Sequence, residues 1–269
     1  MKRAARSGST SPLLQASFVL HVGAAGAVIA WPPLWPWLLG AVMVNHLLLA
    51  AAGLWPRSAL LGPNWTRLPA SREGAARVAI TIDDGPDPEV TPQVLALLDE
   101  YGAKATFFCI GERVERHPEL AREILRRGHA IENHSQHHLH RFSLLGPRGM
   151  AGELAQAQAA IVRVTGDAPR FFRAPAGLRS PFLEPVLARL DLQLASWTRR
   201  GFDTVTRDPA AIHARLARGL AAGDILLLHD GHAARTPTGT PVILEVLPRL
   251  LATCVAAGLA PVTLRAALS

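Results

Sequence analysis

The chain has 269 residues, of which 49% are hydrophobic and 18% charged, a composition that suits one large domain with an appendage or two small domains. Its formal net charge is +7, but the basic residues are scattered and there is a single Tyr for base stacking, which argues against a nucleic-acid partner. An anionic membrane surface or a phosphate-bearing lipid fits this charge better. The two cysteines form no CxxC pair, and Cys109 lies in an apolar run, so we interpret Cys109 as a buried small hydrophobe.

The first 56 residues are predicted to be a membrane anchor. No Lys, Arg, Asp or Glu stands between Arg6 and Arg57, and this uncharged stretch is long enough for two spans of about 20 residues each. Trp and Pro residues at 31–37 divide it and are typical of a short hairpin at a membrane interface. We therefore expect spans at 12–31 and 35–55. A cleaved signal peptide, a single signal anchor and a buried soluble hairpin are the alternatives.

Flanking charge predicts the orientation of this hairpin. The loop between the two spans carries no charge, whereas basic residues precede and follow the pair, namely Lys2, Arg3, Arg6, Arg57, Arg67, Arg72 and Arg77. Because positively charged flanks favour the cytoplasm, both ends of the hairpin are expected there. The domain that follows is then predicted on the cytoplasmic side of a bacterial-type inner (plasma) membrane.

Residues 57–75 are interpreted as a linker, and residues 76–269 as a catalytic domain in which strands alternate with helices. Short apolar runs predict strands near 78–82, 105–110, 130–132, 171–173, 193–197, 224–229 and 261–264. Helix-like stretches lie between them, near 90–101, 113–127, 148–165, 181–190, 208–221 and 240–257. This alternation predicts an α/β fold with a parallel sheet, either open or closed into a barrel.

Polar residues cluster directly after the predicted strands. They are Asp83, Asp84, His134, His138, Arg173, Asp203 and His229. Parallel α/β folds build their active sites at the C-terminal ends of the strands. These side chains are therefore expected to converge on one site.

Two of these groups have the spacing of metal ligands. Asp83 and Asp84 are adjacent at a strand end, where one can bind a metal and the other can accept a proton; a solvated loop or helix cap is the alternative. His134 and His138 are four positions apart, so on a helical turn they would face the same side and share one metal. His137 and His140 are extra candidates that we expect outside the coordination sphere. Two imidazoles and one carboxylate leave positions open for water and substrate, as in catalytic sites.

Two further residues have less specific signals. Arg173 follows an apolar pair and can hold a carboxylate in its ionised form by lowering its pKa, although a structural ion pair is an equal alternative. His229 ends the apolar run 225–228. If a carboxylate orients its imidazole, His229 can donate a proton to a leaving amine.

These segments, in this order, resemble the polysaccharide deacetylase (NodB-homology) family of carbohydrate esterases over about residues 77–265. The likeness is carried above all by Thr81-Ile82-Asp83-Asp84-Gly85-Pro86 and His134-Ser135-Gln136-His137-His138. It implies a distorted (β/α)7-like barrel and assigns Asp83 as the catalytic base. It also implies that the metal ligands are Asp84, His134 and His138.

The resemblance implies further roles. Arg173 would position the base, and Asp203 would tune His229, the acid. The substrate pocket would include Trp197, Leu227, Pro175 and Ala176, with the backbone N–H of Ala176 available to an oxyanion.

Departures from the family pattern affect the part of the site that reads the sugar. Arg200 stands where many relatives carry Asp, and Thr204 stands where Trp is common. Ala176 replaces a frequent aromatic residue. For this reason chitin or peptidoglycan is not carried over as the substrate.

The sequence thus predicts a metal-dependent hydrolase that removes an N-acetyl or N-formyl group from an amino sugar in a glycan or lipid-linked saccharide. Zinc suits the ligands best, and cobalt or nickel also fits them. One alternative is a deacetylase of peptidoglycan or another envelope polysaccharide outside the cytoplasm, and another is an inactive relative that acts as a binding protein. A metal-dependent nuclease or phosphatase would require more carboxylates and a clearer phosphate cradle.

Overall fold

The computed structural model describes residues 11–70 and 74–268. The basic residues Lys2, Arg3, Arg6 and Arg72, which contribute to the predicted orientation, lie outside the described residues. The helices are α1 (Pro12–Ala30), α2 (Trp35–Leu54), α3 (Thr91–Glu100), α4 (Gly111–Arg116), α5 (Pro118–Arg126), α6 (Pro147–Thr165), α7 (Leu183–Arg189), α8 (Pro209–Ala217) and α9 (Val242–Ala256). The strands are β1 (Arg77–Asp83), β2 (Ala105–Cys109), β3 (Ala130–Asn133), β4 (Phe171–Phe172), β5 (Gln193–Leu194), β6 (Arg199–Arg200), β7 (Ile225–His229) and β8 (Ala260–Pro261).

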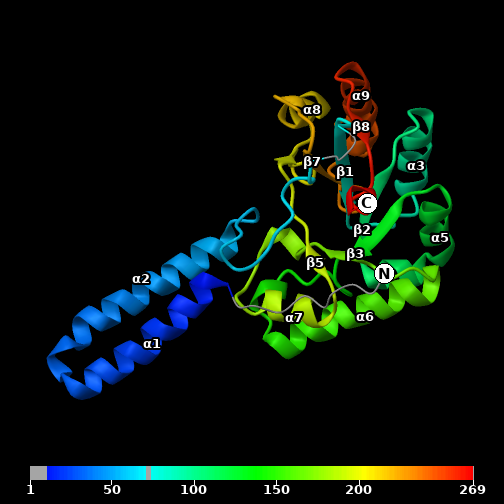
Figure 1. The fold of residues 1–269 in the computed structure, drawn as a ribbon. Helices are drawn as coiled ribbons and strands as arrows, with labels where there is room; N and C mark the ends of the chain where they lie inside the picture. Colours follow the sequence, from blue (N-terminus) through cyan, green and yellow to red (C-terminus); the bar gives the residue numbers. More distant parts are fainter. Residues whose placement is uncertain (1–10, 71–73, 269) are drawn as a thin grey trace.

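Within these residues the strands form one eight-stranded sheet in the order β5-β4-β3-β2-β1-β7-β6, with β8 paired to β1. The paired strands run parallel, and β1 lies between β2 and β7 (Figure 1). Strand β1 is buried at every position after Arg77, as expected for a parallel strand covered on both faces. The predicted α/β fold is confirmed as a curved half-barrel of parallel strands.

Alternate residues of the central strands serve two different cores. Ile80, Phe107 and Leu226 pack with apolar residues of α3, α5, α8 and α9 on one face of the sheet. Their sequence neighbours Ala79 and Phe108 point to the other face, into a second cluster that includes Trp197 and Leu227. All these side chains are buried.

Most predicted elements are present, with shifted ends. The predicted helix 113–127 is two helices, because Pro118 cannot continue a hydrogen-bonded helix and α4 ends at Arg116. Strand β6 is short and polar and was not predicted.

Cys109 and Cys254 are both buried, as expected of Cys109, and neither is paired within the described residues.

The hairpin α1–α2 extends away from the sheet (Figure 1). Within the described ranges, two helical segments, Pro12–Ala30 and Pro32–Leu54, are long and apolar enough to cross a membrane, and only 11% and 17% of their apolar windows are buried. Low burial separates them from core helices, whereas a signal sequence passes the same test of length and composition. The two helices are joined inside the hairpin by a hydrogen bond from Asn45 to Ser17 (2.9 Å).

The chain after α2 lies against the domain. Of the segment predicted as a linker, residues 57–70 are described as far as the gap at 71–73, and there Leu61 and Leu68 are buried. The hydroxyl of Ser196 donates to the carbonyl of Pro56 (2.5 Å), and the backbone N–H of Arg179 donates to the carbonyl of Gly53 (3.0 Å). The end of the hairpin is therefore fixed beside the loops that follow β4 and β5.

Candidate active site

The two adjacent carboxylates lie at the end of β1, as the sequence predicts. Asp83 is the last residue of the strand, and Asp84 has φ +76°, a left-handed conformation that Asp tolerates better than most residues. This turn in the backbone brings both side chains into one site. Gly85 continues the turn beside the carboxylate of Asp230, where an added Cβ would lie 2.5 Å from an Asp230 oxygen. The turn therefore requires glycine at this position.

The histidine pair lies on a loop, and the expected helical turn is not formed. Residues 134–138 are irregular, with positive φ at Ser135 (+64°) and His138 (+50°). The Ser135 hydroxyl accepts a hydrogen bond from the backbone N–H of His138 (3.0 Å), which holds the loop closed. The spacing correctly predicted that His134 and His138 meet, but the backbone that brings them together is a loop following β3.

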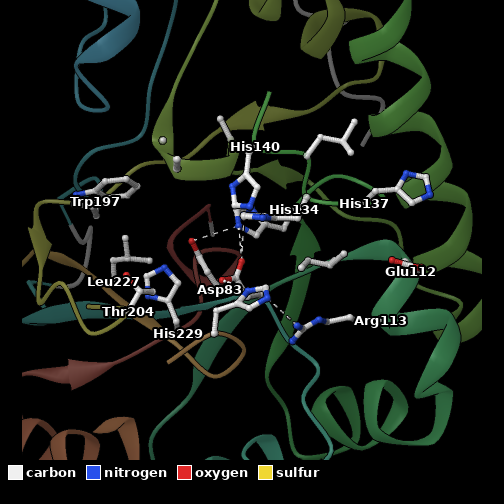
Figure 2. Close-up of a pocket in the computed structure, with 18 of the residues that line it drawn as sticks. Asp83, Glu112, Arg113, His134, His137, His140, Trp197, Thr204, Leu227 and His229 are labelled. Carbon is white, nitrogen blue, oxygen red and sulfur yellow. Dashed lines mark hydrogen bonds and ion pairs between the residues drawn. The ribbon is translucent and has the colours of Figure 1, made fainter. Parts of the chain in front are cut away.

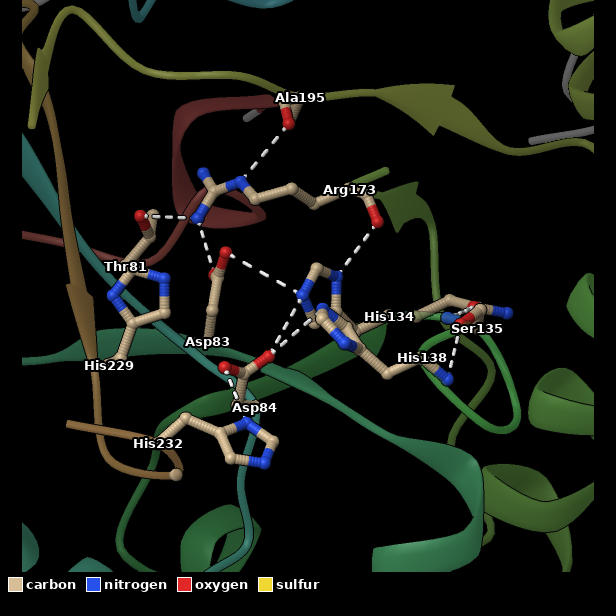
Figure 3. Close-up of polar contacts among 12 residues, drawn as sticks. Thr81, Asp83, Asp84, His134, Ser135, His138, Arg173, Ala195, His229 and His232 are labelled. Carbon is tan, nitrogen blue, oxygen red and sulfur yellow. Dashed lines mark hydrogen bonds and ion pairs between the residues drawn. The ribbon is translucent and has the colours of Figure 1, made fainter. Parts of the chain in front are cut away.

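Asp84, His134 and His138 converge as the ligand set predicts. The Nε2 atoms of His134 and His138 lie 3.2 and 3.3 Å from the same oxygen, Oδ1 of Asp84 (Figure 3). One ligand atom from each residue lies within 4.8 Å of the others. That Asp84 oxygen is buried and has no hydrogen-bond partner among the described residues. An unpaired buried carboxylate oxygen between two imidazoles fits a divalent cation.

The ionisation states of Asp84 and His138 suit a metal. Burial opposes ionisation of Asp84, but the imidazoles of His134 and His232 outweigh it and hold the pKa of Asp84 well below its usual range. Nδ1 of His134 donates to the carbonyl of Arg173 (2.8 Å), which leaves Nε2 as the coordinating nitrogen. Burial, reinforced by the charge of His134, lowers the pKa of His138 to about 4, so this imidazole is neutral at neutral pH.

The two extra histidines of this region do not join the ligand set. His137 is turned toward α6, where its Nδ1 lies 2.8 Å from Glu153 and its backbone N–H donates to the same carboxylate. His140 is exposed and has its ring 6.3 Å from that of His138. Their positions agree with the expectation that they lie outside the coordination sphere.

Arg173 binds Asp83, the second carboxylate. The guanidinium is 1% exposed and donates to Oδ1 of Asp83 (2.6 Å) and to the hydroxyl of Thr81 (2.8 Å). Its other nitrogens donate to the carbonyls of Ala195 and Ser196, and its plane lies over the ring of Phe108 at 4.1 Å. A buried guanidinium with these contacts fixes the orientation of Asp83.

On the opposite side of the cavity, His229 ends β7 and is held by Asp203. Both oxygens of this buried carboxylate are used, one by Nδ1 of His229 (2.9 Å) and the other by its backbone N–H (2.7 Å). Burial alone would lower the pKa of His229, but the charge of Asp203 raises it to about 9. At neutral pH this imidazole is therefore a cation with Nε2–H available as a proton donor.

These residues surround a cavity of about 710 Å³. Trp197, Leu227 and His229 line one side of it and Glu112 and Arg113 the other (Figure 2). Ala176 also lines it, in a turn with φ +54° that follows β4.

Of the residues in this turn, Pro175 was predicted to belong to the pocket and its neighbour Gly177 was not. Pro175 is buried in the same turn as Ala176 and is not among the described residues that line the cavity. Gly177 must be glycine, because a Cβ there would lie 2.6 Å from Trp197 and 2.9 Å from Pro56.

The structure adds one residue that the sequence did not predict, His232. Its Nδ1 lies 3.1 Å from Oδ2 of Asp84 (Figure 3), and its Nε2 lies 3.2 Å from Arg113. Because Arg113 can only donate, Nε2 is the acceptor and Nδ1–H donates to Asp84. His232 thus occupies the Asp84 oxygen that does not face His134 and His138. The signal available in the sequence was the position of His232, three residues after His229.

A parallel α/β half-barrel with an Asp-His-His cluster that could hold a metal ion, a buried Asp–Arg pair and an Asp–His pair at its strand ends is an arrangement that suits a hydrolase. A family model described as polysaccharide deacetylase matches residues 70–195. A peptidoglycan-N-acetylglucosamine deacetylase of Bacillus cereus is 35% identical over 175 residues, which cover 64% of this chain and 81% of that protein. A chitooligosaccharide deacetylase of Sinorhizobium fredii is 34% identical over 61% of this chain and 76% of its own length.

Solved structures agree with these relatives. A family 4 carbohydrate esterase from Streptomyces lividans, in complex with acetate, has a TM-score of 0.63 and 31% identity, covering 69% of this chain and 91% of that one. This chain belongs to the polysaccharide deacetylase family, the NodB-homology group of carbohydrate esterases. It is a hydrolase that acts on N-acetyl amino sugars.

Proposed function

We propose that this protein is a membrane-anchored, metal-dependent N-deacylase of a lipid-linked amino sugar. The observation that carries the chemistry is the meeting of Asp84, His134 and His138 around one unpaired carboxylate oxygen, with Asp83 beside them. The full set of base, ligands and acid argues against an inactive binding protein.

Each residue of the site has a defined task in this proposal. A divalent cation held by Asp84, His134 and His138 would polarise the amide carbonyl and make water more acidic. Asp83, oriented by Arg173, accepts the proton of the attacking water. The backbone N–H of Ala176 stabilises the oxyanion, and His229 protonates the departing amine.

The anchoring and the lipid carrier rest on the first part of the chain. In this proposal residues 1–56 are the anchor, with spans at 12–31 and 35–55, and 76–269 are the catalytic domain, on the cytoplasmic side. Pro56, which follows α2, accepts a hydrogen bond from Ser196, one residue before the cavity-lining Trp197; this contact supports a substrate presented at the membrane surface.

A second candidate is the deacetylation of an envelope polysaccharide outside the cytoplasm. It is favoured by the named activity of the Bacillus cereus relative. Reporter fusions to the C-terminus distinguish the two, because alkaline phosphatase is active only outside the cytoplasm. Activity of a phosphatase fusion would contradict the cytoplasmic placement.

The chemistry is tested on the full chain in detergent. Chelation should abolish the release of acetate or formate from amino-sugar substrates, and zinc, cobalt or nickel should restore it. Mass spectrometry of membrane glycolipids and envelope glycans, with and without the active protein, identifies the acyl group by the mass lost. Undiminished hydrolysis after complete removal of metal would contradict the proposal.

A further inference from the structure

A second groove adjoins the active-site cavity on the side of the hairpin. It has a volume of about 610 Å³ and is formed by the last turn of α2, the residues that follow it and the β6 region. Trp197 and Arg200 line both this groove and the catalytic cavity, so the two adjoin at these side chains. A molecule that places a sugar in the cavity can therefore extend along the groove toward α2.

Arg200 stands at the junction and is free to bind an anion. Its guanidinium lies over two aromatic rings, 5.5 Å from the ring centre of Trp197 and 5.0 Å from that of Phe202. Its Nε is buried and has no hydrogen-bond partner among the residues that the structure describes. No hydrogen bond or ion pair among the described residues involves this guanidinium, so its other nitrogens can bind an anion at the groove through charge-assisted hydrogen bonds.

The groove carries a second cation. Arg57 lines it and has one guanidinium contact, a hydrogen bond to the carbonyl of Thr198 (3.3 Å). Among the described residues that line the groove none is acidic, so both arginines are left without a neutralising carboxylate there. Two guanidinium groups without a local counter-charge favour a phosphate or diphosphate over a neutral sugar chain.

The outer part of the groove is apolar. Leu54 and Trp55, at the end of α2, are 67% and 61% exposed, and Phe202 is 47% exposed. The groove thus combines exposed apolar side chains with two arginines, Arg57 and Arg200, at the end of an apolar helix. This combination matches an amphiphile with a charged head and an alkyl chain. A soluble polysaccharide offers neither of these parts.

The geometry points to a lipid-phosphate subsite: the sugar lies in the catalytic cavity, its phosphodiester contacts Arg200 and Arg57, and the alkyl chain runs past Phe202 and Trp55 toward the membrane. The substrate class is thus an N-acyl amino sugar joined to a lipid through phosphate. This inference deepens the proposed function and rests on it for the chemistry at the sugar.

The test compares three probes on the full chain in mixed micelles. They are dodecyl phosphodiester of N-acetylglucosamine 1-phosphate, dodecyl N-acetylglucosaminide without phosphate, and the methyl phosphodiester without the alkyl chain. We expect kcat/KM for the first probe to exceed that for each of the others by about tenfold, because the glucosaminide lacks the charge-assisted hydrogen bonds to the arginines and the methyl phosphodiester lacks the apolar chain. Arg200→Gln should remove most of the advantage conferred by phosphate, and Arg57→Gln part of it.

Arg207→Gln is the matched control, because it removes an equal charge from an exposed position that lines neither cavity. The ratio between probes should be unchanged in this variant. Phe202→Ser should reduce the preference for the dodecyl chain over the methyl group and leave the phosphate preference in place.

The outcomes separate this inference from the proposed function. If the neutral probe is deacetylated as fast as the phosphodiester, the subsite is wrong and the deacylase stands. If the methyl phosphodiester is equally good, the lipid occupant is wrong. If no probe is hydrolysed, binding of the dodecyl phosphodiester to the Asp83→Asn variant decides: a loss of affinity on adding Arg200→Gln supports the subsite, and equal affinity overturns it.

Discussion

His138 and His229 lie in one pocket, and the pKa of His138 is lowered to about 4 whereas that of His229 is raised to about 9. Burial lowers the pKa of both. The difference comes from the neighbours, because His138 faces another imidazole, His134, whereas both oxygens of the buried Asp203 are bound to His229. One side of the pocket thus holds a neutral imidazole at His138, as a metal ligand must be, and the other holds an imidazolium at His229, which suits the proposed protonation of a leaving amine.

The largest expected effect distinguishes the proposed base, Asp83, from a proposed metal ligand, His134. Asp83→Asn keeps the three ligands but removes the base, so turnover should fall by about 10²–10⁴-fold with metal content unchanged. His134→Ala removes a ligand and should lose both metal and turnover. Metal analysis and acetate release measure the two quantities on the same preparations. Full activity in either variant would disprove the assignment.

The acid side is tested by Asp203→Asn. His229 acts as an acid when protonated, so kcat/KM should fall as pH rises through about 9 in the unmodified enzyme. Without the charge of Asp203, the pKa of His229 should drop toward or below about 6.5, and this alkaline limb should move to lower pH. The pH profile of kcat/KM measures the shift, and metal content should not change. An alkaline limb that stays in place would mean that another group is the acid.

His232 allows a finer test of the metal side. His232→Ala removes the hydrogen bond to the outer oxygen of Asp84, so the Kd for zinc should rise by about tenfold or more, as for other residues that orient metal ligands. Competition with a chelating dye measures this Kd. His140→Ala is the control, because His140 lines the same cavity and is exposed. Equal loss in both variants would argue against a specific role for His232.

The smallest effect is expected at His137. This residue lies between the two histidine ligands in sequence but pairs with Glu153, and its side chain is 45% exposed. His137→Ala should change the free energy of unfolding by less than ~1 kcal/mol and leave metal content unchanged. Chemical denaturation and metal analysis measure both. A loss of metal would show that the loop after β3 coordinates through a different histidine.

Much of the fold was predictable because its signals are local. Strands β1, β2 and β7 are continuous apolar runs, and a buried parallel sheet requires that pattern. Strand β6 escaped prediction because its two residues, Arg199 and Arg200, are charged and half-buried, so that only pairing with β7 identifies it. The split at Pro118 was readable from proline chemistry.

In the site, residue identity was more predictable than backbone geometry. The spacing of His134 and His138 correctly indicated a shared partner, but the loop depends on a positive φ at Ser135 that no periodicity encodes. His232 contacts Asp84 across 148 positions of the chain, so its part in the site became visible only in the fold. The same holds for Arg57 and Arg200, which share a groove although distant in sequence.

The contact of Pro56 with Gly177 and Ser196 has a practical consequence for enzymology. A shortened chain lacking the first 56 residues is the usual route to a soluble sample. It would lose the packing of Pro56 against Gly177, in the turn that carries Ala176. The hydroxyl of Ser196 would also lose its acceptor. Rates measured on such a fragment would describe an altered enzyme, so reconstitution of the whole polypeptide into bilayers is the appropriate setting for kinetics.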